Sequence, residues 1–160
     1  MSGDIWPLHT FRFELEFQPA PLVGTGTGKA PVDGAFAECT GLEATMEPRM
    51  IQAGGRNYGA VQRAGPVTFG TVVLKRGISP GGRLASWFTR VAGGDYGYRC
   101  TVRVRLKAPA EDGKPRTVLT YKLERAMPVK FKAADFNARA TDVGIEELHL
   151  VHEGLSIEEG

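Results

Sequence analysis

VTFGTVVLKRGISPGGRLASWFTRV, residues Val67 to Val91, decides the fold because it joins a strand, a turn and the clearest helix pattern in the chain. Val67 to Lys75 is rich in β-branched and aromatic residues and runs into Arg76-Gly77, which predicts one mostly buried strand followed by a turn. Pro80-Gly81-Gly82 then interrupts the chain before the helix pattern begins.

The helix is predicted from apolar residues that recur at i, i+3, i+4 and i+7, namely Leu84, Trp87, Phe88 and Val91. Gly93-Gly94 predicts its C-terminal end. A single short helix cannot bury a Trp and a Phe by itself, so we expect it to lie on strands.

Most of the remaining chain alternates apolar and polar residues, which is typical of half-buried antiparallel strands. The alternating segments are Thr10 to Phe17, Ala35 to Met46 with a kink at Thr40-Gly41, Tyr98 to Lys107, Thr117 to Phe131 and Val143 to Leu155. A tight turn is predicted at Glu111-Asp112-Gly113-Lys114, and a change of phase predicts a β-bulge at Glu146-Glu147. The sequence therefore predicts an antiparallel β-barrel or sandwich with one short α-helix packed at its side.

The length of 160 residues suits a single domain, 1–160, which can bury roughly two-thirds of its unfolded surface. Two long loops are expected, at 18–34 and 53–66. The first contains GTGTGK, but Val23 stands where a phosphate-binding loop needs its first glycine, and Ala30 stands where it needs Ser or Thr. We therefore expect a flexible loop at 18–34.

The second loop, AGGRNYGAVQRAGP, has two interpretations. It is either an exposed loop or an arm that docks on another copy of the chain, since long excursions between strands tend to be functional or disordered. The contact residues of such an arm would be Arg56, Asn57, Tyr58 and Arg63.

A basic row follows the helix: Arg99, Arg103, Arg105 and Lys107 fall on the outward side of the strand predicted at Tyr98 to Lys107. Like charges along one strand face repel each other, so the row must be solvated or must face acidic groups. A plain solvated face is the favoured interpretation, and a functional row is the alternative.

Bulk composition excludes several classes of protein. Lys plus Arg number 20 against 18 Asp plus Glu, and this net charge of +2 gives no general argument for binding nucleic acid or membrane. Cys39 and Cys100 lie inside strand patterns, which suits buried thiols in a reducing compartment rather than a disulfide. MSGDIWPLHT lacks the features of a signal peptide, and no apolar run approaches the roughly 20 residues of a membrane span. We expect no membrane anchor and a protein that stays in the cytosol until something else moves it.

The sequence offers no catalytic constellation. His149 and His152 are three residues apart on a strand and would point to opposite faces, so we expect no metal site. Patterns for nucleophilic, metallopeptidase, redox and dinucleotide sites are missing from the sequence. We expect no cofactor and no enzymatic activity, and instead a role in binding or assembly. The competing class is a monomeric β-barrel that binds a small apolar ligand, in the style of lipocalins.

Several blocks, read in order, resemble one family. They are Phe36-Ala-Glu-Cys-Thr-Gly-Leu-Glu43, Thr71-Val-Val-Leu-Lys-Arg-Gly-Ile78 before the Trp-bearing helix, Arg125-Ala-Met-Pro-Val-Lys-Phe131, Asp135-Phe-Asn-Ala138 and Ile145 to Leu155. Together they cover about Phe11 to Leu155 and resemble the tail-tube proteins of contractile phage tails and contractile injection systems.

The resemblance implies a β-barrel with a helix at its side, six copies closing into a ring, and rings stacking on copies of themselves or on a paralogous ring to form a hollow tube. It implies a sheath whose contraction drives the tube through a target envelope, baseplate and hub partners, and a cargo effector or DNA in the lumen. Such a subunit assembles in the cytoplasm and ends in a virion or an extracellular or cell-bound particle.

Within this family the 53–66 arm is expected to make the axial contact between rings, and the basic row is expected to line the lumen or face the sheath. The sequence departs from the family in its longer 18–34 loop and at Arg63-Ala-Gly-Pro66. Both the main tube subunit and a tube-initiator ring therefore stay open.

Overall fold

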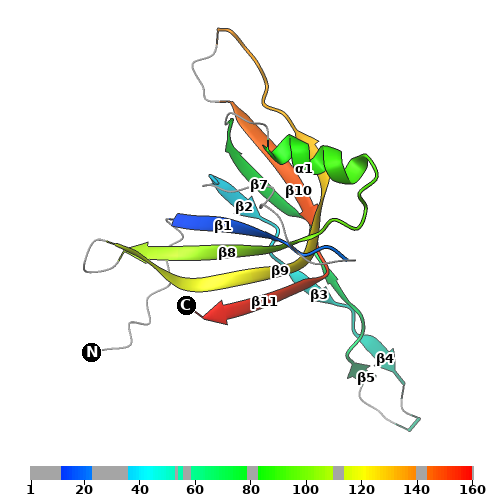
Figure 1. Cartoon of the computed structure of the whole chain (residues 1–160). Helices are drawn as coiled ribbons and strands as arrows, with labels where there is room; N and C mark the ends of the chain where they lie inside the picture. The colour runs from blue at the N-terminus through cyan, green and yellow to red at the C-terminus, as the bar shows by residue number, and fades with distance from the viewer. Residues whose placement is uncertain are drawn as a thin grey trace.

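The fold is a strongly curved set of antiparallel strands with one helix at its side (Figure 1). The computed structural model describes residues 12–22, 36–52, 54–55, 59–78, 83–109, 114–139 and 144–159. Its elements are β1 (Arg12–Pro19), β2 (Glu38–Thr40), β3 (Ala44–Met46), β4 (Arg49–Ile51), β5 (Val61–Arg63), β6 (Val67–Phe69), β7 (Val72–Gly77), α1 (Arg83–Ala92), β8 (Cys100–Pro109), β9 (Pro115–Lys132), β10 (Ile145–Val151) and β11 (Gly154–Glu159). The predicted class, antiparallel β with one short helix at its side, is confirmed.

The long strand β9 joins two sheets. Its first part pairs with β8 on one side and with β11 on the other, and β8 pairs in turn with β1. We call these four strands sheet A. The last part of β9 pairs with β10, and β10, β7 and β2 follow in order, which we call sheet B. Between the two parts lies Arg125, a non-glycine residue with a positive φ of 50°, where the strand leaves one sheet for the other.

The core fills the space between the sheets and α1. It contains the inward residues of β1 and β8 that the alternation predicted, Leu15, Phe17, Cys100, Val102 and Val104, and the residues Val72, Leu74, Leu148 and Leu150 of sheet B. Leu84, Trp87 and Val91 of α1 are buried against them, and Phe88 is partly buried. The Trp87 ring meets the Phe17 ring edge-on with centroids 5.5 Å apart, so the helix is fixed on β1 by an aromatic pair.

Helix α1 ends at the predicted glycines. The Asp95 N–H donates to the Arg90 carbonyl at 3.2 Å, and the Gly94 N–H donates to the Val91 carbonyl at 3.3 Å. These two bonds form a Schellman motif, which requires a positive φ at Gly94, and this angle is 130°.

The single strand predicted over Val67 to Lys75 is wrong. β6 is mostly exposed and pairs with β3, whereas β7 is central in sheet B. The break falls at Gly70-Thr71, where the segment that links β2 to β3 runs alongside and comes very close, since a Cβ on Gly41 would lie 2.0 Å from the Thr71 carbonyl oxygen. Gly41 has φ +88° at this close approach, which confirms the kink predicted at Thr40-Gly41.

The predicted β-bulge at Glu146-Glu147 is also wrong. β10 pairs with β7 without interruption, and its even residues face inward throughout, including the buried Glu146. Glu146 can lie inward because its Oε1 is 3.0 Å from Nε of the buried Arg76. The predicted strand also divides into β10 and β11 around His152-Glu153.

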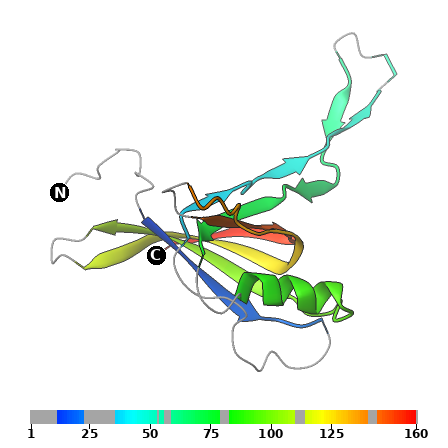
Figure 2. The same ribbon diagram turned by 90° about the horizontal axis from the view of Figure 1, so that it is seen from above.

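The described residues between 44 and 69 form an arm that stands away from the two sheets (Figures 1 and 2). Its root is the pair β3 and β6, and beyond it β4 pairs with β5. The expected loop at 53–66 is therefore shorter than predicted, because Val61–Arg63 belongs to a strand. The expected loop at 18–34 also starts later than predicted, because β1 extends to Pro19. Residues 23–35, which include the GTGTGK segment, lie outside the described residues.

His152 lies at the root of this arm. Its ring centroid is 5.0 Å from that of Phe69 in β6, and its Nδ1–H donates to the Gly154 carbonyl at 3.0 Å. Its Nε2 is buried and has no hydrogen-bond partner among the described residues. Burial therefore lowers the pKa of His152 from its ordinary value of 6.5, although the Gly154 bond acts in the opposite direction.

This lowered pKa predicts acid destabilisation. The unfolded chain binds a proton at His152 more readily than the folded chain, so this contribution to stability is lost as the pH falls below about 6.5. In urea titrations between about pH 7 and 5, the free energy of unfolding of wild type should fall more steeply than that of His152→Phe. If the free energy of unfolding fell equally with pH in the two proteins, this account of His152 would be contradicted.

The close approach of Gly41 to Thr71 predicts a second effect on stability. Gly41→Ala should lower the free energy of unfolding by more than about 2 kcal/mol, because alanine is strained at φ +88° and its Cβ would collide with Thr71. Gly97→Ala is the matched control, since nothing lies within 4 Å of its added Cβ, and it should change stability by less than about 1 kcal/mol. If the two variants lost equal amounts of unfolding free energy in urea denaturation, the close approach of Gly41 to Thr71 would be contradicted.

Candidate functional site

Neither a metal-binding group of side chains nor an activated thiol is present among the described residues. They contain no group of three or more His, Cys, Asp or Glu side chains placed to hold a metal ion. The ring of His149 lies 3.3 Å from Glu147, and His152 is bonded to Gly154, so the two histidines have separate partners. Burial raises the pKa of the free thiol of Cys39 to about 11 and that of Cys100 to about 12, which leaves both protonated and weakly nucleophilic at neutral pH.

In the part of the chain that the structure describes, no helix combines the length and apolar character needed to cross a membrane.

Sheet A has two open edges. Within the described residues β1 pairs only with β8, and β11 pairs only with β9. Each of these strands therefore presents a row of backbone N–H and C=O groups that lack a strand partner, the arrangement that templates pairing with another chain. The four strands alternate in direction, so β1 and β11 run antiparallel to each other on opposite sides of the sheet.

The predicted basic row lies mostly on the face of sheet A that points away from the core. Arg103, Arg105 and Lys107 are half-buried there and alternate with the buried residues of β8. Arg99 precedes β8 and differs from the others, because its Nε is buried without a hydrogen-bond partner in the part of the chain that the structure describes. The sequence thus placed three of these four side chains on a common strand face, as the alternation of β8 shows.

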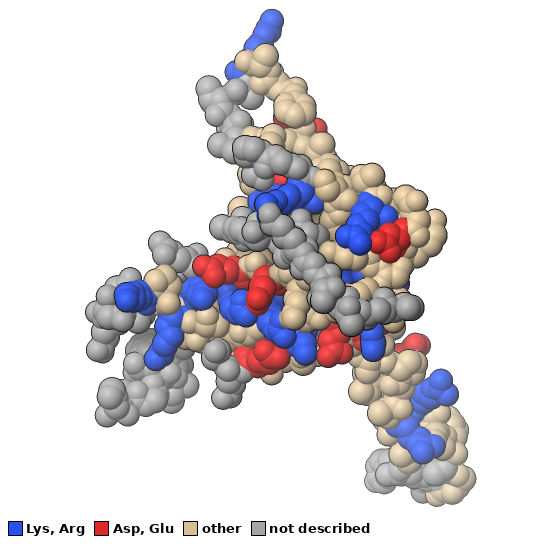
Figure 3. All heavy atoms as spheres, viewed as in Figure 1, with Lys and Arg blue, Asp and Glu red and all other residues tan. Residues whose placement is uncertain are grey.

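Acidic side chains from both edge strands neutralise this row. Arg105 pairs with Glu16, Lys107 Nζ is 3.7 Å from Glu14, and Arg103 Nε is 4.0 Å from Glu158 of β11. Figure 3 shows Lys and Arg side chains interspersed with Asp and Glu side chains over this part of the molecule. Exposed pairs of this kind are worth about 0–1 kcal/mol each, so they balance the charge of the face more than they hold the sheet together.

The arm is the second candidate surface. Its predicted contact residues Arg56, Asn57 and Tyr58 lie outside the described residues, and Arg63 lies on β5 directly across from Arg49. Sequence analysis missed the large apolar side chains that the arm exposes, which are Met46, Met50, Ile51, Val61 and Val67. They do not form an alternating pattern, because each of the four strands β3 to β6 is only three residues long.

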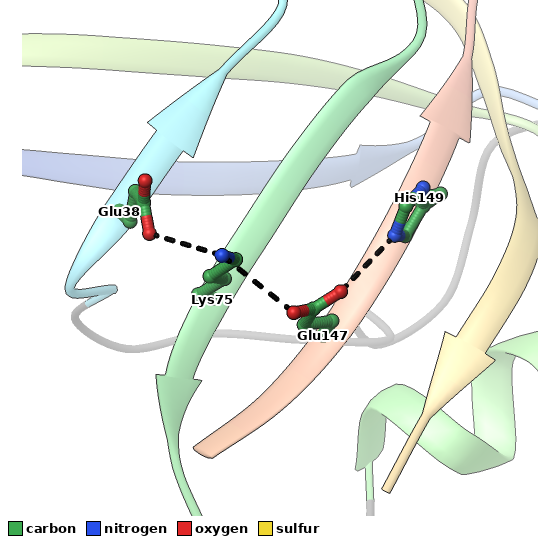
Figure 4. A network of polar contacts seen from close by, with 4 residues as sticks. All are labelled: Glu38, Lys75, Glu147 and His149. Atoms are coloured by element: carbon green, nitrogen blue, oxygen red, sulfur yellow. Dashed lines mark hydrogen bonds and ion pairs between the residues drawn. The ribbon is translucent and has the colours of Figure 1, made fainter.

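The third surface is a groove at the end of sheet B opposite the arm. Across β2, β7 and β10 runs a polar network in which Lys75 Nζ lies 3.4 Å from Glu38 and 3.6 Å from Glu147 (Figure 4). His149 hydrogen-bonds Glu147 and, with Lys75 nearby, lowers the pKa of that carboxyl group. A groove of about 540 Å³ opens beside the network, with Ile78, Phe136 and Ile145 among its lining residues. Sequence analysis missed it because its residues come from four separate segments.

Comparison with known proteins identifies the family of the chain. A family model described as the T4-like virus tail tube protein gp19 matches residues 9–156. A search of curated protein sequences gave no significant match.

Three solved structures illustrate the likeness. The chain is 27% identical to a chain in the cryo-EM structure of the anti-feeding prophage (AFP) baseplate, six-fold symmetrised, with a TM-score of 0.76 over 99% of this chain and 98% of that one. It is 16% identical, with a TM-score of 0.74, to a chain of the extracellular contractile injection system PVC sheath-tube complex in the extended state, over 98% and 95% of the two chains. It is 10% identical, with a TM-score of 0.57, to a type six secretion system protein, over 93% and 83%. The last two likenesses show the fold alone.

The family model covers nearly all of sheet A, sheet B, α1 and the arm, so the match is not confined to one motif. By this match the chain belongs to the T4-like virus tail tube protein family and is a structural tube subunit.

Proposed function

We propose that six copies of this chain close into a ring by joining sheet A edge to edge, and that the rings stack into the hollow inner tube of a contractile particle. The observation that carries the proposal is the pair of open edges on sheet A, β1 and β11. Each copy would act as one domain spanning residues 1–160, with a structural rather than a catalytic role.

The strand directions favour closure by rotation. Because sheet A has an even number of alternating strands, a copy rotated about an axis brings its β1 antiparallel to the β11 of its neighbour. Repeating this contact around a ring leaves no open edge in the sheet. A closed barrel of more than about sixteen strands encloses an aqueous channel rather than a packed core.

The two faces of sheet A differ in character, which supports an assignment of the side that lines the channel. One face is covered by the core, and the other carries the paired charges of Arg103, Arg105 and Lys107. We propose that this charged face lines the lumen, where an effector protein or DNA would pass. The basic row would then meet cargo only after its acidic neighbours are displaced, because those carboxylates already lie beside it.

The similar structures support the proposed partners. Structures similar to this chain come from a six-fold symmetrised baseplate and from a sheath-tube complex, which supports a baseplate and a sheath as partners here. We propose that sheath contraction drives the tube through a target envelope, after assembly in the cytoplasm. The 27% identity to a baseplate chain favours a ring next to the baseplate, and the main tube is the alternative position.

The ring is tested by negative-stain microscopy and light scattering of the purified full chain. The proposal expects rings with six-fold symmetry and a mass six times that of the chain. A monomer at every concentration, with a small apolar molecule bound between the sheets, would instead favour the monomeric ligand-binding barrel.

The arm should be needed for stacking but not for ring closure. Replacing residues 47–66 with Asn-Gly joins Met46 to Val67, which already pair across β3 and β6, through a two-residue turn that suits a hairpin. This variant should form rings and no long tubes in electron micrographs, because its exposed apolar tip is gone. Tubes of normal length from the variant would exclude an axial role for the arm.

The paired charges should keep the channel from binding polyanions. Glu14→Gln with Glu16→Gln removes the acidic partners of Lys107 and Arg105, so assembled tubes of this variant should retain more short duplex DNA than wild type, and salt should release it. Glu43→Gln with Glu47→Gln makes the same change of charge at the arm root and should retain no extra DNA. Equal retention by the two double variants would place the sheet A face outside the lumen.

A further inference from the structure

We propose that the groove beside Phe136 is the receptor for the arm of a copy in the next ring. The inference rests on the proposed stacking of rings and adds the identity of the surface that the arm contacts. It commits to a second copy of this chain as the occupant of the groove.

The arm and the groove lie at opposite ends of one ribbon of strands. β2 leads into the arm and β7 returns from it, whereas Ile78 and Ile145 stand at the far ends of β7 and β10 (Figures 1 and 2). The arm of one copy therefore points away from its own groove. A contact between opposite ends of identical molecules is heterologous and continues from copy to copy, as an axial stack requires.

One face of the arm carries exposed side chains without complementary groups on the arm itself. In the β4–β5 ladder Arg49 lies directly across from Arg63, and Ile51 lies directly across from Val61. Both pairs are exposed, and these four side chains share one face, with Met50 and Gln62 on the other. Like charges placed directly opposite each other are destabilising, so the arginine pair favours a partner that supplies a carboxylate. The adjacent aliphatic pair favours an apolar partner.

The groove offers both kinds of group. Phe136 is 86% exposed, and Ile78 and Ile145 are each 49% exposed, an unusual grouping of large apolar side chains at one rim. Asp135 adjoins Phe136 and forms no ion pair with any described residue, whereas Glu38 and Glu147 already share Lys75. The chemistry of the groove therefore complements that of the arm, with the apolar rim facing the aliphatic pair and Asp135 facing the arginine pair.

Disulfide trapping tests the contact directly. In tubes carrying Ile51→Cys with Phe136→Cys, a mild oxidant should link successive copies, which appear as a ladder of multimers on a non-reducing gel. Met50→Cys with Phe136→Cys is the matched control, because residue 50 lies on the opposite face of β4, and it should give little ladder. The raised pKa values of Cys39 and Cys100 keep the native thiols from contributing.

Charge exchange provides an independent measurement. Arg63→Glu should leave rings but shorten tubes, and adding Asp135→Arg should restore their length by re-forming the pair with its charges reversed. The inference would be overturned if the Ile51→Cys and Met50→Cys proteins gave ladders of equal strength. It would also be overturned if intact tubes showed neither a ladder nor a rescue of tube length. In both cases the proposed tube would be unaffected. Failure of wild type to form any ring would instead refute the proposed function.

Discussion

The open backbone edges of sheet A are the constraint on which the rest of the structure depends. A sheet edge in water is satisfied by solvent, but it also invites pairing with any other strand, and β1 and β11 present two such edges on one molecule. Neither edge is blunted by a bulge in its pairing with its neighbour. A second copy of the chain is a suitable partner for these edges, because β1 and β11 already run in the directions that antiparallel pairing between rotated copies needs.

The interior of the molecule holds those edges in place. Because β9 belongs to both sheets and bends at Arg125, sheet B and α1 support sheet A from one side only. Phe17 of β1 is buried against Trp87 of α1, so one edge strand is anchored directly to the helix. The opposite face carries charged side chains that pair among themselves, which is consistent with the proposed position of this face on the channel wall.

Periodicity predicted most of the fold, because a regular alternation or a helical stripe is a local property of the chain. β1, β8, β9 and α1 were predicted for this reason, and the ordered blocks pointed to the correct family. The errors arose where contacts between distant segments overruled the local pattern. The charge of Glu146 predicted an outward side chain, but Glu146 lies inward because it pairs with Arg76, which is distant in the sequence. The strand predicted from Val67 is divided at Gly70-Thr71, where Gly41 lies against the Thr71 backbone.

The candidate surfaces were less accessible to sequence reasoning than the fold. The basic row was visible as a pattern, but its neutralisation by Glu14, Glu16 and Glu158 depends on which strands lie beside β8. The groove at Phe136 was invisible, since it exists only where the ends of β7, β9 and β10 meet. Surfaces for assembly are spread over segments that only the fold brings together, and no short motif encodes them.

Amide hydrogen exchange of the edge strands, compared between the isolated chain and the assembled particle, tests the central claim most directly. The account predicts that exchange in β1 and β11 slows strongly on assembly, because their outer backbone groups gain partners from neighbouring copies. Assembled particles in which β1 and β11 exchange as fast as in the isolated chain would contradict it, since the ring would then be held by something other than its sheet edges.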